Sequence, residues 1–375
     1  MVITDRNLRF LCKEILKNVP FVTSIILHGS RAVECPCAKE RDYDVFVVLR
    51  TPLSPFFLKS IKRMEESFRK KKIKIDLSLM PVFRLKYGFE DLSVYNVRAT
   101  GVTIWGRDYL NEFPVGDARR SIGRSWLQYC VYVMRRLMWC FNPYTLNFNV
   151  EATVEALNVC CRLVALLLTG TYFTNTDAML RKLRSIKGSS QLPIGDGAFR
   201  LLEEVTESSE LEPSALFMAV KNEVLEIFRL LIERSYSINT SDSKTLSIEY
   251  LKAARSRSLI ENVLYLFSLY VFRREVFLNA NIFGSSIFDR INMATYWLLN
   301  SIRSDCTIDM DSIMEAYKLL DGWVKLRFHV DARKLWCEVR NVINEYYHYA
   351  RASFQFTLCL YTALSSIFKS TALKG

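Results

Sequence analysis

Apolar and polar residues follow two kinds of pattern in the first third of the chain. Apolar residues spaced three and four apart indicate amphipathic helices, and short continuous or alternating apolar runs indicate strands. These patterns predict, in order, a helix, two strands, a helix and a strand, over residues 5–18, 21–27, 44–49, 54–72 and 72–79. A further helix over 91–100 and a short strand over 102–105 follow. We therefore expect a small α/β unit at the N-terminus.

After residue 114 the strand patterns disappear and helical spacing continues to the end of the chain. Turns are predicted at Asn142-Pro143 and across residues 187–197. The polar stretch 235–247 has no periodicity and is predicted to be a linker or an exposed loop. The expected fold class is α+β, with a small mixed-sheet domain followed by an all-α helical region. The expected domain boundaries are 1–115, 116–240 and 241–375.

The charge of the chain adds a class of partner to this picture. The 375 residues carry 51 Lys and Arg against 39 Asp and Glu, a formal net charge of +12. Residues 1–115 hold 20 of the basic and 13 of the acidic residues, so they carry +7 of that surplus. A basic surplus suits nucleotide phosphates or RNA as partners. Since 50% of the residues are hydrophobic, a wholly disordered protein is excluded.

Cysteine usage and hydropathy bear on the compartment. The ten cysteines lie mostly inside apolar runs, there is no pair of CxxC motifs, and only three histidines are present, which disfavours a zinc site. The first residues are charged throughout and lack a signal-peptide core. The longest uncharged run, Ala352–Phe368, contains Gln, Ser and Thr and is better explained as a buried helix than as a membrane span. We expect a cytoplasmic protein with no membrane partner.

Three aspartates stand out against the strand patterns. Asp42 and Asp44 are two residues apart at the start of a predicted buried strand, so their side chains point to one face. Asp76 lies on the polar side of the alternating strand. If these strands pair, three carboxylates converge, and such a cluster is costly unless a cation lies among them. Oxygen-only ligands suit Mg²⁺ or Mn²⁺ rather than zinc.

A second polar group ends the first predicted strand. Gly29 allows the backbone to approach a phosphate closely, and the amides that follow, together with the Ser30 hydroxyl, can hold its oxygens. Arg31, Lys39 and Arg41 lie in the loop before the aspartates and can add positive charge.

The spacing of these groups resembles a known family. Gly29-Ser30, eleven intervening residues, Asp42-Tyr43-Asp44 and then Ile75-Asp76-Leu77 are similar to the signature of the nucleotidyltransferases of the DNA polymerase β superfamily, especially the minimal nucleotidyltransferases. The segment 101–114 resembles the one that often closes their catalytic domain. Beyond it, residues 157–183 loosely resemble the helical domain of aminoglycoside nucleotidyltransferases.

The resemblance implies an activity and a role for each group. Members move a nucleoside monophosphate from an NTP to an acceptor and release pyrophosphate, with two divalent metal ions, Mg²⁺ or Mn²⁺. By this resemblance Asp42 and Asp44 hold both ions, Asp76 holds the ion on the acceptor side, and Gly29-Ser30 orients the terminal phosphates. Glu155 is a candidate base for the acceptor hydroxyl.

The sequence leaves other questions open. An RNA end, a protein side chain and a small molecule all fit as acceptor, and the basic surplus favours RNA slightly. The alternative function is a helical binding or complex-forming protein with a vestigial nucleotidyltransferase domain, related to toxin–antitoxin systems. Arg340 and His348 resemble the paired motif of HEPN ribonucleases, although ordinary helix packing explains them as well. Five arginines fit either a cleft lining or amphipathic packing: Arg119, Arg120, Arg124, Arg135 and Arg136.

Overall fold

The chain divides into two compact units in the computed structural model, Met1–Ser121 with Leu358–Gly375, and Ile122–Thr357. The structure describes all residues except 1–4, 34–41, 51–57, 88–91, 114–122, 174, 188–193, 208–211, 241 and 373–375. The boundary that the sequence predicts near residue 240 falls inside the second unit, and a separate domain from there onward stays a prediction.

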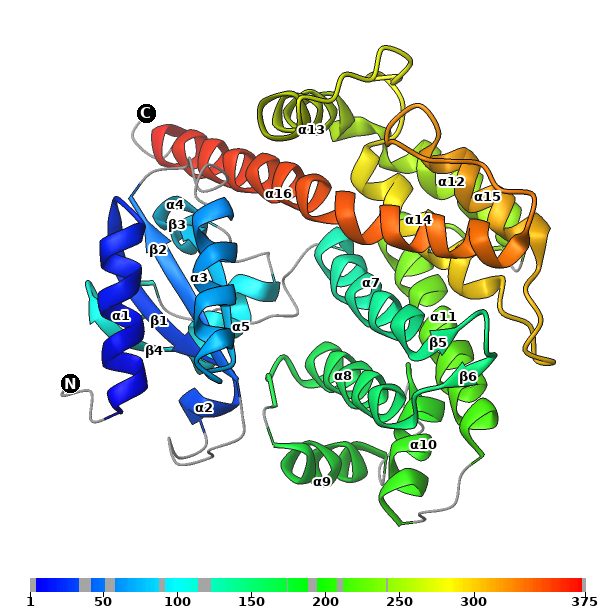
Figure 1. Ribbon diagram of the computed structural model, residues 1–375, viewed down its shortest axis with the longest axis horizontal. Helices are drawn as coiled ribbons and strands as arrows, with labels where there is room; N and C mark the ends of the chain where they lie inside the picture. Colours follow the sequence, from blue (N-terminus) through cyan, green and yellow to red (C-terminus); the bar gives the residue numbers. More distant parts are fainter. Residues whose placement is uncertain are drawn as a thin grey trace. The chain divides into compact units, whose positions relative to one another are not determined.

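The first unit is built on a four-stranded mixed sheet, which confirms the predicted fold class (Figure 1). Its strand order is β3-β2-β1-β4; β2 and β3 are parallel, and β1 is antiparallel to both β2 and β4. The strands are β1 Val22–His28, β2 Tyr43–Leu49, β3 Ile75–Pro81 and β4 Val102–Gly106. The helices are α1 Arg6–Asn18, α2 Ser30–Val33, α3 Leu58–Lys70, α4 Val82–Tyr87, α5 Leu92–Thr100 and α6 Tyr109–Glu112.

Each face of the sheet has its own apolar core. Alternate residues of β2, such as Val45 and Val47, pack with α1 and α3 on one face. Phe46 and Val48 of the same strand pack with α4, α5 and α6 on the other. A strand buried on both faces reads as a continuous apolar run, and each fully buried Val or Phe contributes about 1.5–3 kcal/mol. This double burial holds β2, and therefore the residues at its start, in a fixed position.

Strand β3 differs from its prediction at both ends. It begins at Ile75 and continues through Met80 to Pro81, beyond the alternating stretch. The reason is that Met80 is buried in the core on the α4 side, so the far half of β3 is covered on both faces. Strand β3 also lies at the edge of the sheet, where the side chain of Glu65 on α3 accepts a hydrogen bond from the Leu77 amide at 3.0 Å. This contact satisfies an edge amide that pairing leaves open.

In the residues that the structure describes, the second unit is built of helices, with a small hairpin and an isolated β-bridge between Ile302 and Ile308. Helix α14 lies at its centre, because nearly every residue from Ile287 to Leu299 is buried. The sequence did not predict the hairpin of β5 Phe141–Asn142 and β6 Asn147–Phe148 around the Asn142-Pro143 turn. The other elements are α7 Gly123–Cys140, α8 Val150–Thr169, α9 Thr176–Lys187, α10 Asp196–Glu207, α11 Pro213–Tyr236, α12 Ser243–Ala253, η3 Ala254–Arg257, α13 Ser258–Arg273, α14 Ile287–Asn300, α15 Met310–Leu320 and α16 Ala332–Ala372.

The polar stretch 235–247 is not a linker throughout. Helix α11 continues to Tyr236 and α12 begins at Ser243. Asp242 caps α12, because its carboxylate accepts a hydrogen bond from the Thr245 amide at 2.8 Å. Polar residues that read as a loop are therefore the cap and first turn of a helix.

An ion-pair network is buried inside the second unit. Both carboxylate oxygens of Glu261 accept hydrogen bonds from the Arg124 guanidinium, at 2.7 and 2.8 Å. Asp289 accepts a third from Arg124 at 2.7 Å and one from the Tyr250 hydroxyl at 2.6 Å. The four residues come from α7, α12, α13 and α14. This network ties four helices together, so Arg124 is a packing residue and not part of an exposed cleft.

One helix within the described residues, α8, is long and apolar enough to cross a membrane by length and composition alone. Half of its 18-residue apolar window is buried, which a core helix of a soluble protein also satisfies. It packs against α7, α10 and α11 in the second unit.

Candidate functional site

Strands β2 and β3 bring two of the three aspartates side by side. Asp44 and Asp76 are paired residues on these parallel strands, so their side chains leave the same face of the sheet. This is the face that also carries Phe46, packed with α4 and α5. Asp42 precedes β2 by one residue and shares the alternation of Asp44. The structure thus confirms the expected pairing of the two strands and the common face of Asp44 and Asp76. That the Asp42 carboxylate joins them stays a prediction.

Gly29 lies directly against Asp44. Its backbone has a φ of +73°, in the left-handed region that favours glycine. A Cβ at this position would approach the Asp44 Oδ2 to 2.3 Å. No larger residue fits without displacing the carboxylate, so the glycine holds the turn after β1 close to Asp44.

The charges of the aspartates influence one another. Asp76 keeps contact with solvent, but the surrounding protein raises the pKa of its carboxyl, and the negative charge of Asp42 raises it further. A bound cation relieves such repulsion between like charges. The oxygen-only donor set fits Mg²⁺ or Mn²⁺. As placed, however, no group of three His, Cys, Asp or Glu side chains in the described chain is arranged to hold a metal ion.

The residues predicted to bind nucleotide phosphates lie partly elsewhere. Arg31 is buried, its guanidinium lies 3.8 Å from the centre of the Tyr43 ring, and it is 4.0 Å from the Asp5 carboxylate. Tyr43 faces the core on the α1 side, opposite to Asp44. As placed, Arg31 packs α2 onto β2, and its contact with a nucleotide stays a prediction. Lys39, Arg41 and the side chain of Ser30 lie outside the described residues.

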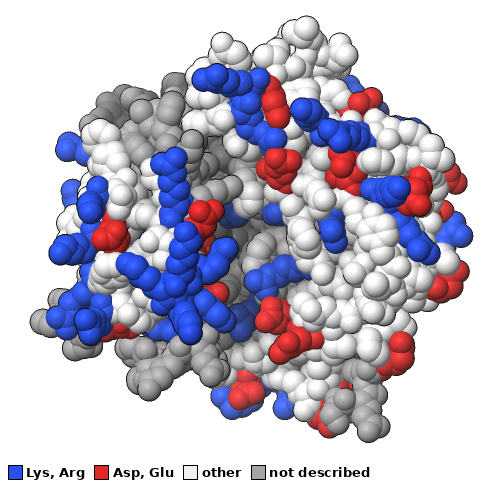
Figure 2. Space-filling model, in the orientation of Figure 1, with Lys and Arg blue, Asp and Glu red and all other residues white. Residues whose placement is uncertain are grey.

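A basic ridge lies at the same end of the sheet as the aspartates. It consists of five exposed side chains at the end of α3 and in the turn to β3: Arg69, Lys70, Lys71, Lys72 and Lys74. Because this turn leads directly into the start of β3, the ridge is only a few residues from Asp76 in the chain. Figure 2 shows blue side chains gathered over this part of the first unit. The ridge supplies positive charge near a site whose own side chains are acidic.

The sequence matches no protein-family model and no curated protein. Among solved structures, spectinomycin adenyltransferase AAD(9) from Enterococcus faecialis, solved with ATP and spectinomycin, is similar over 59% of this chain and 96% of that chain. The identity is 13% and the TM-score is 0.38. A likeness of that size does not extend to substrate or mechanism, so the residues of the site have to carry any functional conclusion.

Two other residues that the sequence suggested for a functional role, Glu155 and Arg340, belong to the second unit. Glu155 is exposed on α8, where its carboxylate accepts a hydrogen bond from Arg136 at 3.3 Å. The Arg340 guanidinium lies over two tryptophan rings, 4.3 Å from the centre of Trp139 and 5.1 Å from that of Trp336. This stacking is a packing role for Arg340, as the ordinary helical interpretation expected. The role of Glu155 as a base stays a prediction.

His28 pairs with Asp44 across β1 and β2, and its ring lies against Phe46 with ring centres 4.6 Å apart and planes tilted by 39°. Burial lowers the pKa of His28 from 6.5 to about 4, so the imidazole beside the aspartates is neutral at pH 7. No sequence motif marked this residue, since a lone histidine before a glycine is also typical of simple packing.

This shift predicts a pH dependence of stability. The unfolded chain binds a proton to His28 below about pH 6.5 but the folded chain does so only near pH 4, so stability rises with pH through that window. Between pH 7 and pH 4 the free energy of unfolding of the wild type should fall by up to about 3 kcal/mol more than that of His28→Phe. This variant keeps an aromatic ring at the position and removes the titrating group. Urea unfolding at several pH values measures the difference. If the free energy of unfolding of the two proteins changed with pH in the same way, the imidazole would not be neutral and buried as described.

Proposed function

We propose that this chain is a metal-dependent nucleotidyltransferase that joins a nucleoside monophosphate from an NTP to an acceptor hydroxyl. The observation that carries the proposal is the packing of Gly29 against Asp44, with Asp76 beside Asp44 on the parallel strand. A glycine turn lets the backbone approach a phosphate closely, and paired carboxylates suit a divalent metal ion, so the two together support phosphate and metal binding at one place.

The transfer replaces one phosphorus–oxygen bond with another and moves one proton. The acceptor oxygen bonds to the α-phosphorus, the bond from that phosphorus to the bridging oxygen of the β-phosphate breaks, and pyrophosphate leaves. Asp42, Asp44 and Asp76 would hold the Mg²⁺ or Mn²⁺ ions, which neutralise charge on the attacking and leaving oxygens when bound. The acceptor proton passes to a base, for which Asp76 and Glu155 are the candidates. The backbone after Gly29 would receive the phosphates that leave.

The acceptor that fits the charge pattern best is an RNA end. The basic ridge from Arg69 to Lys74 lies at the aspartate end of the sheet, and it suits a polyanion better than a neutral small molecule. This choice rests on the ridge alone and is separate from the assignment of the aspartates.

Binding of Mg-NTP tests the proposal first. Wild-type protein should bind a labelled NTP in a Mg²⁺-dependent way, and Asp42→Ala/Asp44→Ala should lose that binding at least tenfold because both carboxylates hold the metal. Glu66→Ala, which removes an exposed carboxylate on α3, is the matched control and should bind like wild type. Calorimetry gives the affinities, and circular dichroism checks that each variant is folded.

The destination of the label tests the acceptor. Wild type is incubated with α-labelled NTPs and a cell extract, and the label is followed into RNA, protein and small molecules. Label in RNA supports the choice made from the ridge, and label in another fraction overturns that choice. If wild type binds no Mg-NTP, the active-enzyme proposal fails and the alternative of a vestigial domain in a binding protein takes its place.

A further inference from the structure

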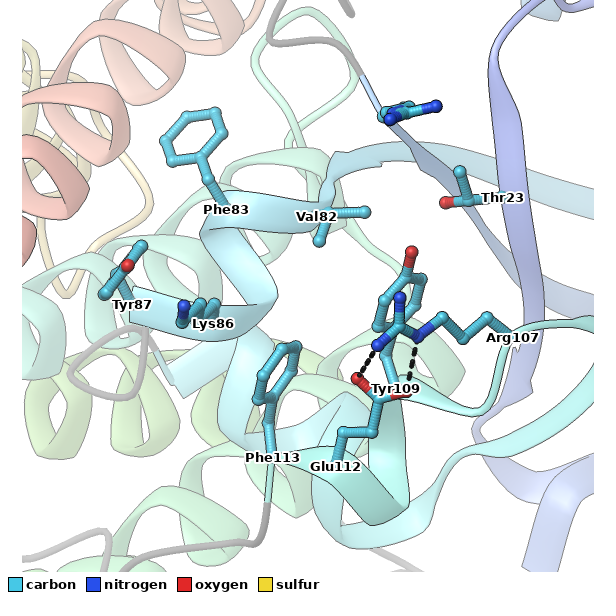
Figure 3. Close-up of a pocket in the computed structure, with 10 residues that line it drawn as sticks. Thr23, Val82, Phe83, Lys86, Tyr87, Arg107, Tyr109, Glu112 and Phe113 are labelled. Carbon is cyan, nitrogen blue, oxygen red and sulfur yellow. Dashed lines mark hydrogen bonds and ion pairs between the residues drawn. The ribbon is translucent and has the colours of Figure 1, made fainter.

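An open pocket of about 760 Å³, called the cavity below, lies in the first unit (Figure 3). Its walls include Arg50, which follows β2, Val82, which follows β3, and Arg107, which follows β4. Asp44 and Asp76 lie at the opposite ends of β2 and β3. Since a seven-residue strand spans roughly 20 Å, the cavity is a separate place on the molecule.

The floor of the cavity is aromatic. Phe83 and Tyr87 come from α4, and Tyr109 and Phe113 come from α6 and its end. The rings of Tyr109 and Phe113 are nearly parallel, with centres 6.0 Å apart and planes 6° apart. Figure 3 shows Tyr109 and Phe113 on one side of α4, together with Arg107 and Glu112, and the Phe83 ring extending from the other side. Tyr109 is buried, so the rings partly open to solvent are those of Phe83, Tyr87 and Phe113. A planar base can stack on such rings, and stacking stabilises binding by about 1–3 kcal/mol per base.

The rim of the cavity is positively charged. Arg107 is held by Glu112 through two hydrogen bonds, at 2.5 and 2.9 Å, so the two charges neutralise each other. Arg50 and Lys86 are exposed, and no carboxylate in the described part of the chain pairs with either. The rim therefore keeps two positive charges beside the aromatic floor, which attract an anionic group.

Backbone contacts with Thr23 hold the segment Gly106-Arg107 in a defined position. Gly106 has a φ of +83°, and a Cβ there would lie 2.2 Å from the Thr23 carbonyl oxygen. The Arg107 amide donates a hydrogen bond to the same oxygen at 3.0 Å. The wall formed by Thr23, Arg107 and Glu112 is therefore fixed to the start of β1.

We propose that this cavity binds a nucleotide unit, with its base on the aromatic floor and its phosphate at Arg50 and Lys86. An inorganic anion would leave the rings uncovered, and a neutral aromatic compound would leave the cations without a partner. A nucleoside phosphate uses both halves of the cavity, whether it is free or part of single-stranded RNA. The binding needs no metal and no aspartate, so it does not depend on the proposed function.

Binding measurements in EDTA remove the metal-dependent binding at the aspartates, and the cavity variants then report how much of the remaining binding belongs to the cavity. The probes are a fluorescently labelled single-stranded ten-nucleotide oligoadenylate and a fluorescent AMP derivative, followed by anisotropy at about 0.1 M salt. Arg50→Glu/Lys86→Glu should weaken binding at least tenfold because it reverses both rim charges. Tyr87→Leu should weaken it about fivefold or more through lost stacking. Lys13→Glu/Lys17→Glu makes the same charge change at two exposed residues of α1 that do not line the cavity, and it should shift the affinity less than twofold.

The outcomes decide both the site and the source of the ligand. If the cavity variants bind both the oligoadenylate and the AMP derivative more weakly than the wild type, the site accepts a free nucleotide. If they bind only the oligoadenylate more weakly, the ligand is RNA. If the α1 control weakens binding as much as the cavity variant, or if Tyr87→Leu has no effect, the proposal is overturned. Asp42→Ala/Asp44→Ala should bind both probes like wild type in EDTA, so failure here and failure of the nucleotidyltransferase proposal are told apart.

Discussion

Asp76→Asn should strongly slow nucleotidyl transfer and leave NTP binding close to that of the wild type. Asp76 lies beside Asp44 on the edge strand, and its proposed place is on the acceptor side. Loss of its charge removes stabilisation needed in the transition state more than in the bound nucleotide. We expect turnover to fall by about 10²–10³-fold or more, in line with the loss of one charge-stabilising group. Single-turnover kinetics at saturating NTP measures this fall, and calorimetry gives the NTP affinity.

Stability separates this result from simple unfolding. Burial and the charge of Asp42 raise the pKa of Asp76 in the folded chain, so ionised Asp76 lowers stability as the pH rises above its usual pKa. Asp76→Asn should therefore melt at the wild-type temperature or slightly above it at pH 7. Glu66→Gln makes the same chemical change at an exposed position on α3 and should keep full turnover. Near wild-type turnover in Asp76→Asn would show that Asp76 is only a strand residue.

Arg124→Met should destabilise the second unit by about 3–5 kcal/mol, because it leaves two buried carboxylates without their cation. Glu261 and Asp289 are both fully enclosed, and Arg124 donates hydrogen bonds to each. Methionine fills much of the same volume, so the loss reports the charges more than a cavity. For a unit of this size the melting temperature should fall by roughly 10 °C, which calorimetry or thermal circular dichroism measures.

A matched arginine in the same unit provides the control. Arg229 also pairs with two carboxylates, Glu226 and Glu233, both at 2.6 Å, but this cluster is partly exposed to water. Exposed pairs contribute about 0–1 kcal/mol, so Arg229→Met should lower the melting temperature by only a few degrees. Equal effects of the two substitutions would mean that burial of the Arg124 network adds nothing to stability.

The sequence by itself indicated the four strands and the longer helices of the first unit, and the common face of Asp44 and Asp76, but not the short helices α2, α4 and α6. The continuous apolar run of β2 indicated a strand covered on both faces, and the structure places it inside the sheet between β1 and β3. The even spacing of Asp42 and Asp44 and the alternation around Asp76 were enough to predict a common face, because strand geometry fixes the direction of every second side chain. These are local properties. The spacing of apolar residues along the chain shows whether a segment is a helix or a strand and which of its faces is buried.

Only the tertiary structure decided what the charged residues contact. Arg31, near the aspartates in sequence, turned to the opposite face and stacked on Tyr43. Arg124 found partners 137 and 165 residues away, on α13 and α14. The residues around the cavity come from the ends of four strands and from two short helices, and no motif links them. The sequence pattern around a charged residue does not reveal which residue it contacts. Its partner is set by long-range contacts that form only when the sheet and the helices have packed.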